Sequence, residues 1–202
     1  MGDTEPKVVF YSFVNQLAEE LDIEKKTNPD NIDKWLDKDK FWTKIIKESF
    51  GELGKNGKFK VYSNLHESEY LLDLVWEARD TKSGGLILGL ESEWNNKGDE
   101  IEDDFYKLMY TKCKLKVFVY SSSSIENADK LICQFKEYLS WFDGHIPGEK
   151  YLFIDVTEYK DHNKIIGREF TISSSRILDR DTIEFQKIGE FDWDEINKNY
   201  RL

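Results

Sequence analysis

Carboxylate side chains stand inside the most apolar part of this sequence, at Asp73, Glu91 and Glu93. Asp73 lies within the stretch YLLDLVW (70–76), and the two glutamates come near the end of the run GGLILGLESEW (84–94). Burying an ionised carboxylate costs several kcal/mol unless a cation or hydrogen bonds compensate its charge. We therefore expect these acids either to lie at the rim of a sheet or to serve a chemical purpose.

The spacing of the acids predicts that they converge. Side chains of a strand alternate between its faces, so Glu91 and Glu93 share a face. Asp73 can approach Glu91 if the two acid-bearing strands pair. Converging carboxylates repel one another unless a cation lies between them, and hard oxygen ligands suit Mg²⁺ or Mn²⁺, which can activate water and hold a phosphodiester. The alternative is solvated acids at strand ends, because 40 acidic residues are spread along the chain.

A basic residue follows the acidic strand at a short distance in sequence. Lys107 lies on an expected helix, from which it could orient water or stabilise negative charge on a phosphate. The alternative is a surface lysine paired at helical spacing with Asp103 or Asp104. Spacing alone favours the surface pair.

The pattern of apolar residues predicts helices first and then strands with crossover helices. We expect helices at 7–22, 32–36, 39–50, 101–112, 125–142 and from 192 onward, and strands at 59–63, 70–76, 86–93, 115–120, 151–159, 168–173 and 183–188. This order predicts an α/β fold, namely a three-layer α/β/α domain with a mixed central sheet. No linker divides the chain, so we expect one domain over 1–202, with its core at about 40–156 and an N-terminal helix and a C-terminal hairpin added.

Local signals set two of the expected helix ends. Gly51, Gly54 and Gly57 predict that the helix 39–50 ends before them and that a turn opens there. Ser124, the last residue of the run SSSS, is the expected N-cap of the helix 125–142.

The acidic total charge limits which partners the chain can bind by bulk electrostatics. The 202 residues carry a net charge of −11 at pH 7. Long nucleic acids are held by Lys and Arg that neutralise phosphates, so a nucleic-acid site would need a local basic surface. The same charge suits a protein that binds a basic partner. The sequence leaves the oligomeric state open, a homodimer included.

The two cysteines and the chain's hydropathy indicate the compartment. Cys113 and Cys133 lie in apolar settings without CxxC spacing or an adjacent His, which argues against a structural zinc site. We expect both thiols to be reduced and buried and the protein to be cytoplasmic. The N-terminal residues lack the features of a signal peptide, and no apolar run approaches the roughly 20 residues of a membrane span, so we expect no membrane partner.

The order of acids and elements resembles a known superfamily. An acid on one strand, a second strand that ends in acids, a helix and a further strand resemble the restriction-endonuclease-like, PD-(D/E)xK nucleases over about residues 40–120. Asp73 matches the first acid and Glu91 the second, whereas Glu93 stands where the superfamily usually has lysine. In some branches the lysine comes from the following helix, and Lys107 in DFYKL is the matching position.

This resemblance implies metal-dependent hydrolysis of phosphodiester bonds in DNA. It implies that Asp73 and Glu91 bind Mg²⁺ or Mn²⁺, with the backbone carbonyl of Ser92 as a further ligand. Glu93 would complete an acid-rich metal site, and Lys107 would support the attacking water. Glu93 in the lysine position keeps two alternatives open. One is a catalytically inactive nuclease-fold binding module, and the other is an acidic inhibitor or immunity-type protein for a basic partner.

Overall fold

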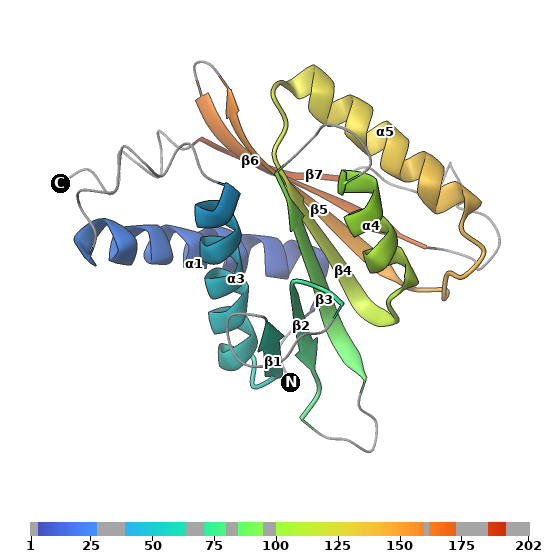
Figure 1. The fold of residues 1–202 in the computed structure, drawn as a ribbon, viewed down its shortest axis with the longest axis horizontal. Coiled ribbons are helices and arrows are strands. Elements are labelled where there is room, and N and C mark those ends of the chain that lie inside the picture. The colour runs from blue at the N-terminus through green and yellow to red at the C-terminus, as the bar shows by residue number, and fades with distance from the viewer. Residues whose placement is uncertain are drawn as a thin grey trace.

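The structure, a computed structural model, places a mixed β-sheet at the centre of the chain (Figure 1). It describes residues 4–27, 39–63, 71–79, 85–94, 100–159, 162–172 and 186–192. The seven strands of these residues, in the order in which they lie side by side, are β1 (Lys60–Ser63), β2 (Leu74–Glu77), β3 (Leu86–Glu93), β4 (Cys113–Tyr120), β5 (Lys150–Tyr159), β6 (His162–Thr171) and β7 (Gln186–Asp192). β3, β4 and β5 run parallel, and the other neighbours are antiparallel.

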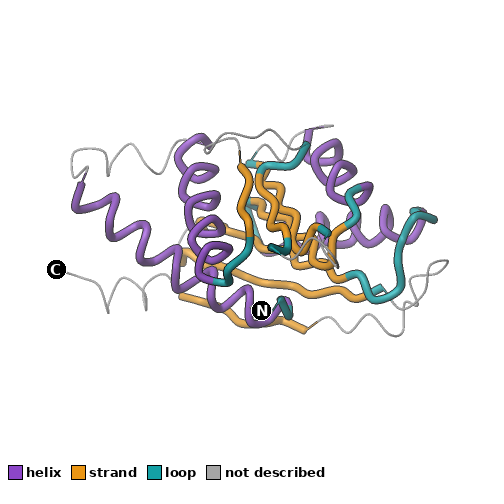
Figure 2. Tube along the Cα trace, turned by 90° about the horizontal axis from the view of Figure 1, so that it is seen from below, coloured by secondary structure: helices purple, strands orange, loops and turns teal. Residues whose placement is uncertain are grey.

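Helices cover both faces of this sheet. In the described residues they are α1 (Pro6–Thr27), α3 (Asp39–Asn56), α4 (Glu100–Tyr110) and α5 (Ile125–Trp141). α1 and α3 pack on one face and α4 and α5 on the other, so Figure 2 shows the strands lying between helices. α4 joins β3 to β4 and α5 joins β4 to β5, because parallel neighbours need a crossover connection. The architecture is mixed α/β.

Two hydrophobic cores form because the side chains of each strand alternate between the two faces. Leu88 and Leu90 of β3 belong to the core under α1 and α3. Phe118 and Tyr120 of β4 belong to the core under α4 and α5. Glu91 follows Leu90 and is aligned with Phe118 in the register of β3 and β4, so it faces the α4 side. The central strand therefore carries a carboxylate into the base of a helix-covered face.

The helix predicted at 39–50 is longer than expected, because α3 continues through its first two glycines to Asn56. A Cβ added at Gly54 would lie 2.5 Å from Trp76 Nε1 and 2.5 Å from Val61 Cγ2. Gly54 therefore allows β1 and β2 to pack closely against the helix, and it does not end the helix. The prediction of a stop near Phe50 was wrong for this tertiary reason.

Other predicted boundaries moved as well. β2 begins at Leu74, so Asp73 lies in a bend before the strand and not inside it. The N-terminal helix extends from its predicted end at residue 22 to Thr27, and β6 begins at His162 in place of 168. β3 and the Ser124 cap of α5 were predicted correctly, with Asn127 N donating to Ser124 Oγ at 3.1 Å. The helices predicted at 32–36 and after 192 lie outside the described residues.

The expectation of two buried thiols holds for one cysteine. Cys113 is buried and Cys133 is exposed, and both are free. Cys133 follows Ile132 on α5, and Ile132 and Phe135 turn inward at helical spacing, which leaves the thiol outside. Among the helices that the structure describes, none has the length and apolar character needed to cross a lipid bilayer.

Candidate functional site

The carboxylate of Asp73 is fastened to the end of β3. Asp73 Oδ2 accepts hydrogen bonds from the Ser92 backbone N–H at 3.0 Å and from the Ser92 hydroxyl at 2.7 Å. The antiparallel register makes this contact possible, because Leu74 lies opposite Leu90 and the bend at Asp73 then comes beside the last residues of β3. The pairing of the two acid-bearing segments expected from the sequence is therefore present.

α3 contributes a lysine to the same carboxylate. Lys47 Nζ lies 2.6 Å from Asp73 Oδ1, and the two side chains are only 5% and 19% exposed. Both oxygens of Asp73 thus have donors: a cation on one side and two donors from Ser92 on the other. Sequence reasoning missed Lys47, which is 26 residues before Asp73 in the chain. The available signal was a lysine three residues before the buried Phe50, on the inward face of a helix.

Glu91 is the least compensated acid of the site. The residue is 3% exposed, and its Oε1 has no hydrogen-bond partner among the residues that the structure describes. Burial, and then the negative charges of Asp73 and Asp104, raise the pKa of Glu91 to about 9, against smaller opposing effects of Lys107 and Lys47. Glu91 is therefore protonated at neutral pH unless a cation stabilises its charge.

Lys107 belongs to the surroundings of Glu91 but pairs within its own helix. Lys107 Nζ lies 2.5 Å from Asp104 Oδ1, with the lysine side chain 46% exposed. Its pKa is raised first by this hydrogen bond, and the charges of Glu91 and Asp73 add to the effect. The structure brings Lys107 near the acids, in the surface pair that helical spacing favoured.

Glu93 and the Ser92 carbonyl receive less from the geometry. Glu93 is half-buried at the end of β3, where its Cα lies opposite that of Tyr120. Ser92 acts on Asp73 through its N–H and its hydroxyl, and a role of its carbonyl as a metal ligand stays a prediction. In the described part of the chain, no group of three or more His, Cys, Asp or Glu side chains is placed to hold a metal ion.

The acids present nevertheless have the chemistry of magnesium ligands. Mg²⁺ keeps several waters and is usually bound through one or two carboxylates together with substrate phosphates, so a third acid is not required. Asp73 and Glu91 supply two carboxylates whose charges interact, and Glu91 Oε1 is a buried oxygen that no described donor satisfies. A divalent cation between them would relieve both the repulsion and the unsatisfied oxygen.

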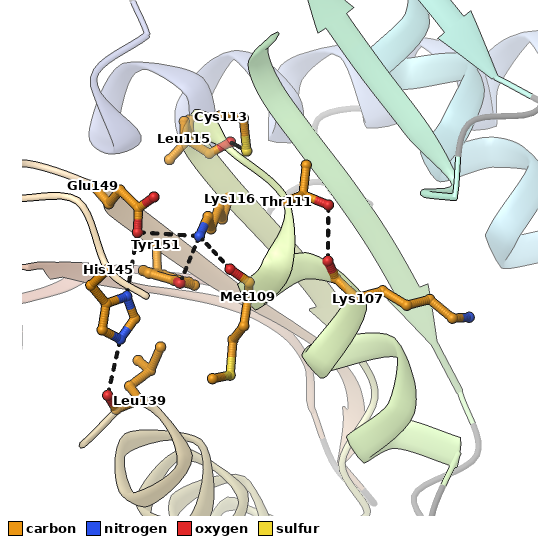
Figure 3. Close-up of polar contacts among 10 residues, drawn as sticks. All are labelled: Lys107, Met109, Thr111, Cys113, Leu115, Lys116, Leu139, His145, Glu149 and Tyr151. Carbon is orange, nitrogen blue, oxygen red and sulfur yellow. Dashed lines mark hydrogen bonds and ion pairs between the residues drawn. The ribbon is translucent and has the colours of Figure 1, made fainter. Parts of the chain in front are cut away.

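A second buried polar cluster, which sequence reasoning missed, lies under α4 (Figure 3). Lys116 Nζ donates to Met109 O at 2.9 Å, to Tyr151 OH at 3.0 Å and to Glu149 Oε2 at 3.2 Å. His145 Nδ1 lies 3.3 Å from the same Glu149 oxygen. Burial lowers the pKa of Lys116 against the opposing charge of Glu149.

This cluster, defined by Lys116, His145, Glu149 and Tyr151, is a structural one. Its side chains are buried and bonded to one another, so it joins the C-terminal end of α4 to β4 and to the start of β5. Figure 3 shows the Lys107 side chain extending away from these residues. The Lys107 side chain therefore lies apart from this cluster.

No family model, curated protein or solved structure matches this chain. A function for it must therefore come from the arrangement of its residues. Asp73 before β2 and Glu91 near the end of β3, with lysines from α3 and α4, form the candidate site in the described structure.

Proposed function

We propose that this protein is a metal-dependent nuclease that hydrolyses phosphodiester bonds in DNA, built on a three-layer α/β/α, restriction-endonuclease-like domain. Its order of elements supports the proposal: α3, the antiparallel strands β1, β2 and β3, then α4 and the parallel strand β4. In the sequence resemblance, Asp73 and Glu91 are the residues that match the two acids of the superfamily.

One observation carries the proposal. The buried Glu91 has an oxygen without a described partner and is electrostatically coupled to Asp73, the acid just before the neighbouring strand β2. Such an arrangement is costly in a protein that has no use for it, because a buried polar group without a partner costs about 1–3 kcal/mol. Strongly raised pKa values of this kind concentrate at functional sites.

The residues have distinct roles in the proposed reaction. Asp73 and Glu91 would hold Mg²⁺ or Mn²⁺, which when bound supplies an activated water and positive charge for the phosphate. Ser92 fixes the direction of the Asp73 carboxylate through two hydrogen bonds. Lys107 can exchange its exposed pair with Asp104 for a contact with the phosphate, because exposed ion pairs are weak. Glu93 would add negative charge beside the metal.

Cleavage of single- and double-stranded DNA in the presence of Mg²⁺ or Mn²⁺ tests the proposal. Glu91→Gln keeps the size of the side chain but cannot become an anion, so we expect cleavage to fall by roughly two orders of magnitude or more. Glu126→Gln is the matched control, since Glu126 is 79% exposed on α5 and pairs with Lys130 there. The proposal fails if the wild type does not cut DNA with either metal, or if Glu91→Gln cuts as fast as the control.

A catalytically inactive nuclease-fold binding module is the second candidate, and two observations favour it. Both oxygens of Asp73 already have donors, and Glu93 takes the position where the superfamily has lysine. On this alternative DNA binds without metal-dependent cleavage, and Glu91→Gln binds it as well as the wild type does. If DNA does not bind at all, the net charge of −11 favours an inhibitor of a basic partner.

A further inference from the structure

Lys47 places a buried positive charge on the proposed metal ligand. Its side chain is 5% exposed and its ammonium is 2.6 Å from Asp73 Oδ1. On either side along α3, Ile46 and Ser49 are fully buried. A buried ammonium needs a compensating charge, and the Asp73 carboxylate supplies one. The amino group is thus held at the position where a metal ion would meet the carboxylate.

A cation would displace the hydrogen bonds on the other oxygen of Asp73 less readily than it would displace Lys47. Asp73 Oδ2 accepts two hydrogen bonds from one residue, Ser92, and one of them is from a backbone N–H in a central strand. Oδ1 is held by a flexible side chain from a helix. A cation that enters the site therefore meets Asp73 through Oδ1, the oxygen held by a side chain and not by the backbone of a strand.

We propose that Lys47 is a built-in competitor for the metal, whose ammonium occupies Asp73 Oδ1 and leaves it when a divalent cation binds between Asp73 and Glu91. The inference rests on the proposed function, because it concerns the same site. It assigns Lys47 a competing role: the lysine stabilises the metal-free site and lowers its affinity for the ion. A divalent ion displaces the lysine because it carries two positive charges and would bind both carboxylates directly, whereas the ammonium carries one charge and is paired with Asp73.

Calorimetric titration of the full chain with Mn²⁺ at one fixed pH tests this role. Lys47→Gln removes the cation but keeps an N–H donor for Asp73, and Lys47→Met removes both. We expect Lys47→Gln to bind Mn²⁺ at least about tenfold more tightly than the wild type, which corresponds to about 1.4 kcal/mol. Lys44→Gln is the matched control, because Lys44 lies on the same helix, is 44% exposed and pairs with Glu24 and Glu48.

The direction of the change separates competition from a merely structural role. If Lys47 only holds Asp73 in place, its loss disorders the carboxylate and weakens Mn²⁺ binding. Equal or weaker binding by Lys47→Gln therefore overturns the inference, as does an equal gain in the Lys44 control. Lys47→Met tests the same direction of change with the N–H donor removed as well. Far-ultraviolet circular dichroism confirms that each variant used is folded.

The outcome is independent of the nuclease activity. A wild type that binds Mn²⁺ without cutting DNA removes the proposed function, and the ratio of Mn²⁺ affinities still decides the role of Lys47. A wild type that cuts DNA, with no affinity gain in Lys47→Gln, keeps the proposed function and removes the competitor. If neither the wild type nor Lys47→Gln binds Mn²⁺, the competitor is overturned as well.

Discussion

Glu91 is the acid of the site whose charge the surroundings compensate least. It is buried, near two other acids, and left with one oxygen that no described residue satisfies. In the absence of metal the protein avoids this uncompensated charge only by keeping a proton on the carboxyl group. The cost of losing that proton should be visible in the stability of the protein.

We expect the stability of the metal-free protein to fall as the pH rises through the neutral range. The pKa of Glu91 is raised from 4.5 to about 9 in the folded state. Between these values the folded protein holds a proton that the unfolded chain has released. The contribution is complete below the unfolded pKa and is lost as the pH rises through the folded pKa, at up to about 1.4 kcal/mol per pH unit.

Urea unfolding at several pH values, with a chelator present, measures this slope. Glu91→Gln carries a neutral amide at every pH, so its free energy of unfolding should depend less on pH than that of the wild type. The control Glu126→Gln changes an exposed carboxylate and should keep the wild-type slope. Identical slopes in wild type and Glu91→Gln would mean that Glu91 ionises normally in the folded protein.

Among the elements, α3 connects the fold to the site. Its glycine Gly54 lets Trp76 pack against the helix, and about two turns earlier its Lys47 reaches Asp73 just before the strand that carries Trp76. The indole Nε1 of Trp76 donates to Phe50 O of the same helix at 3.0 Å. The close packing of Gly54 against Trp76 therefore sets the distance between α3 and β2. This distance determines where the Lys47 ammonium lies.

Two glycine substitutions in α3 should have opposite effects on stability. A Cβ at Gly54 would lie 2.5 Å from atoms of Trp76 and Val61, so Gly54→Ala should destabilise the protein by about 1–3 kcal/mol. A Cβ at Gly51 meets nothing within 4 Å, so Gly51→Ala should stabilise it by about 0.5–1 kcal/mol through helix propensity. Thermal unfolding of both variants checks this, and equal effects would contradict the close packing of Gly54.

The buried Lys116 cluster should matter for the attachment of α4. Lys116→Ala leaves Glu149 buried without its lysine, so we expect a loss of about 3–5 kcal/mol. Lys114 lies two residues earlier on the same strand and is exposed, so Lys114→Ala should stay within about 0.5 kcal/mol of the wild type. Denaturant unfolding compares the two variants, and a small effect of Lys116→Ala would show that the cluster relaxes when its cation is removed.

For the molecule as a whole, a ligand that binds only the folded state raises the melting temperature. Mn²⁺ or Mg²⁺ at 100 times its dissociation constant should stabilise the wild type by about 2.7 kcal/mol. Glu91→Gln should lose most of this effect, and Glu126→Gln should keep it. Thermal scans with and without metal make the comparison. An equal rise in all three proteins would place the metal elsewhere.

Much of the fold follows from local patterns, and the site follows only in part. β3 was predicted to the residue because its apolar run ends in two acids, and the Ser124 cap was predicted because its chemistry is local. The predicted end of α3 was wrong because Gly54 packs against Trp76, which is distant in sequence. Lys47 could not be found by spacing to Asp73, since the contact exists only once α3 lies against the sheet.

The hydrogen bond from the Ser92 N–H to Asp73 has one more consequence. At Ser92 the Asp73 side chain accepts the hydrogen bond that the backbone of a neighbouring strand would otherwise accept. The amide hydrogen at Ser92 is therefore protected from solvent only while the Asp73 carboxylate stays in place. Its rate of exchange with deuterium therefore reports whether the Asp73 carboxylate stays in place. The measurement needs neither a nucleic acid nor a catalytic assay.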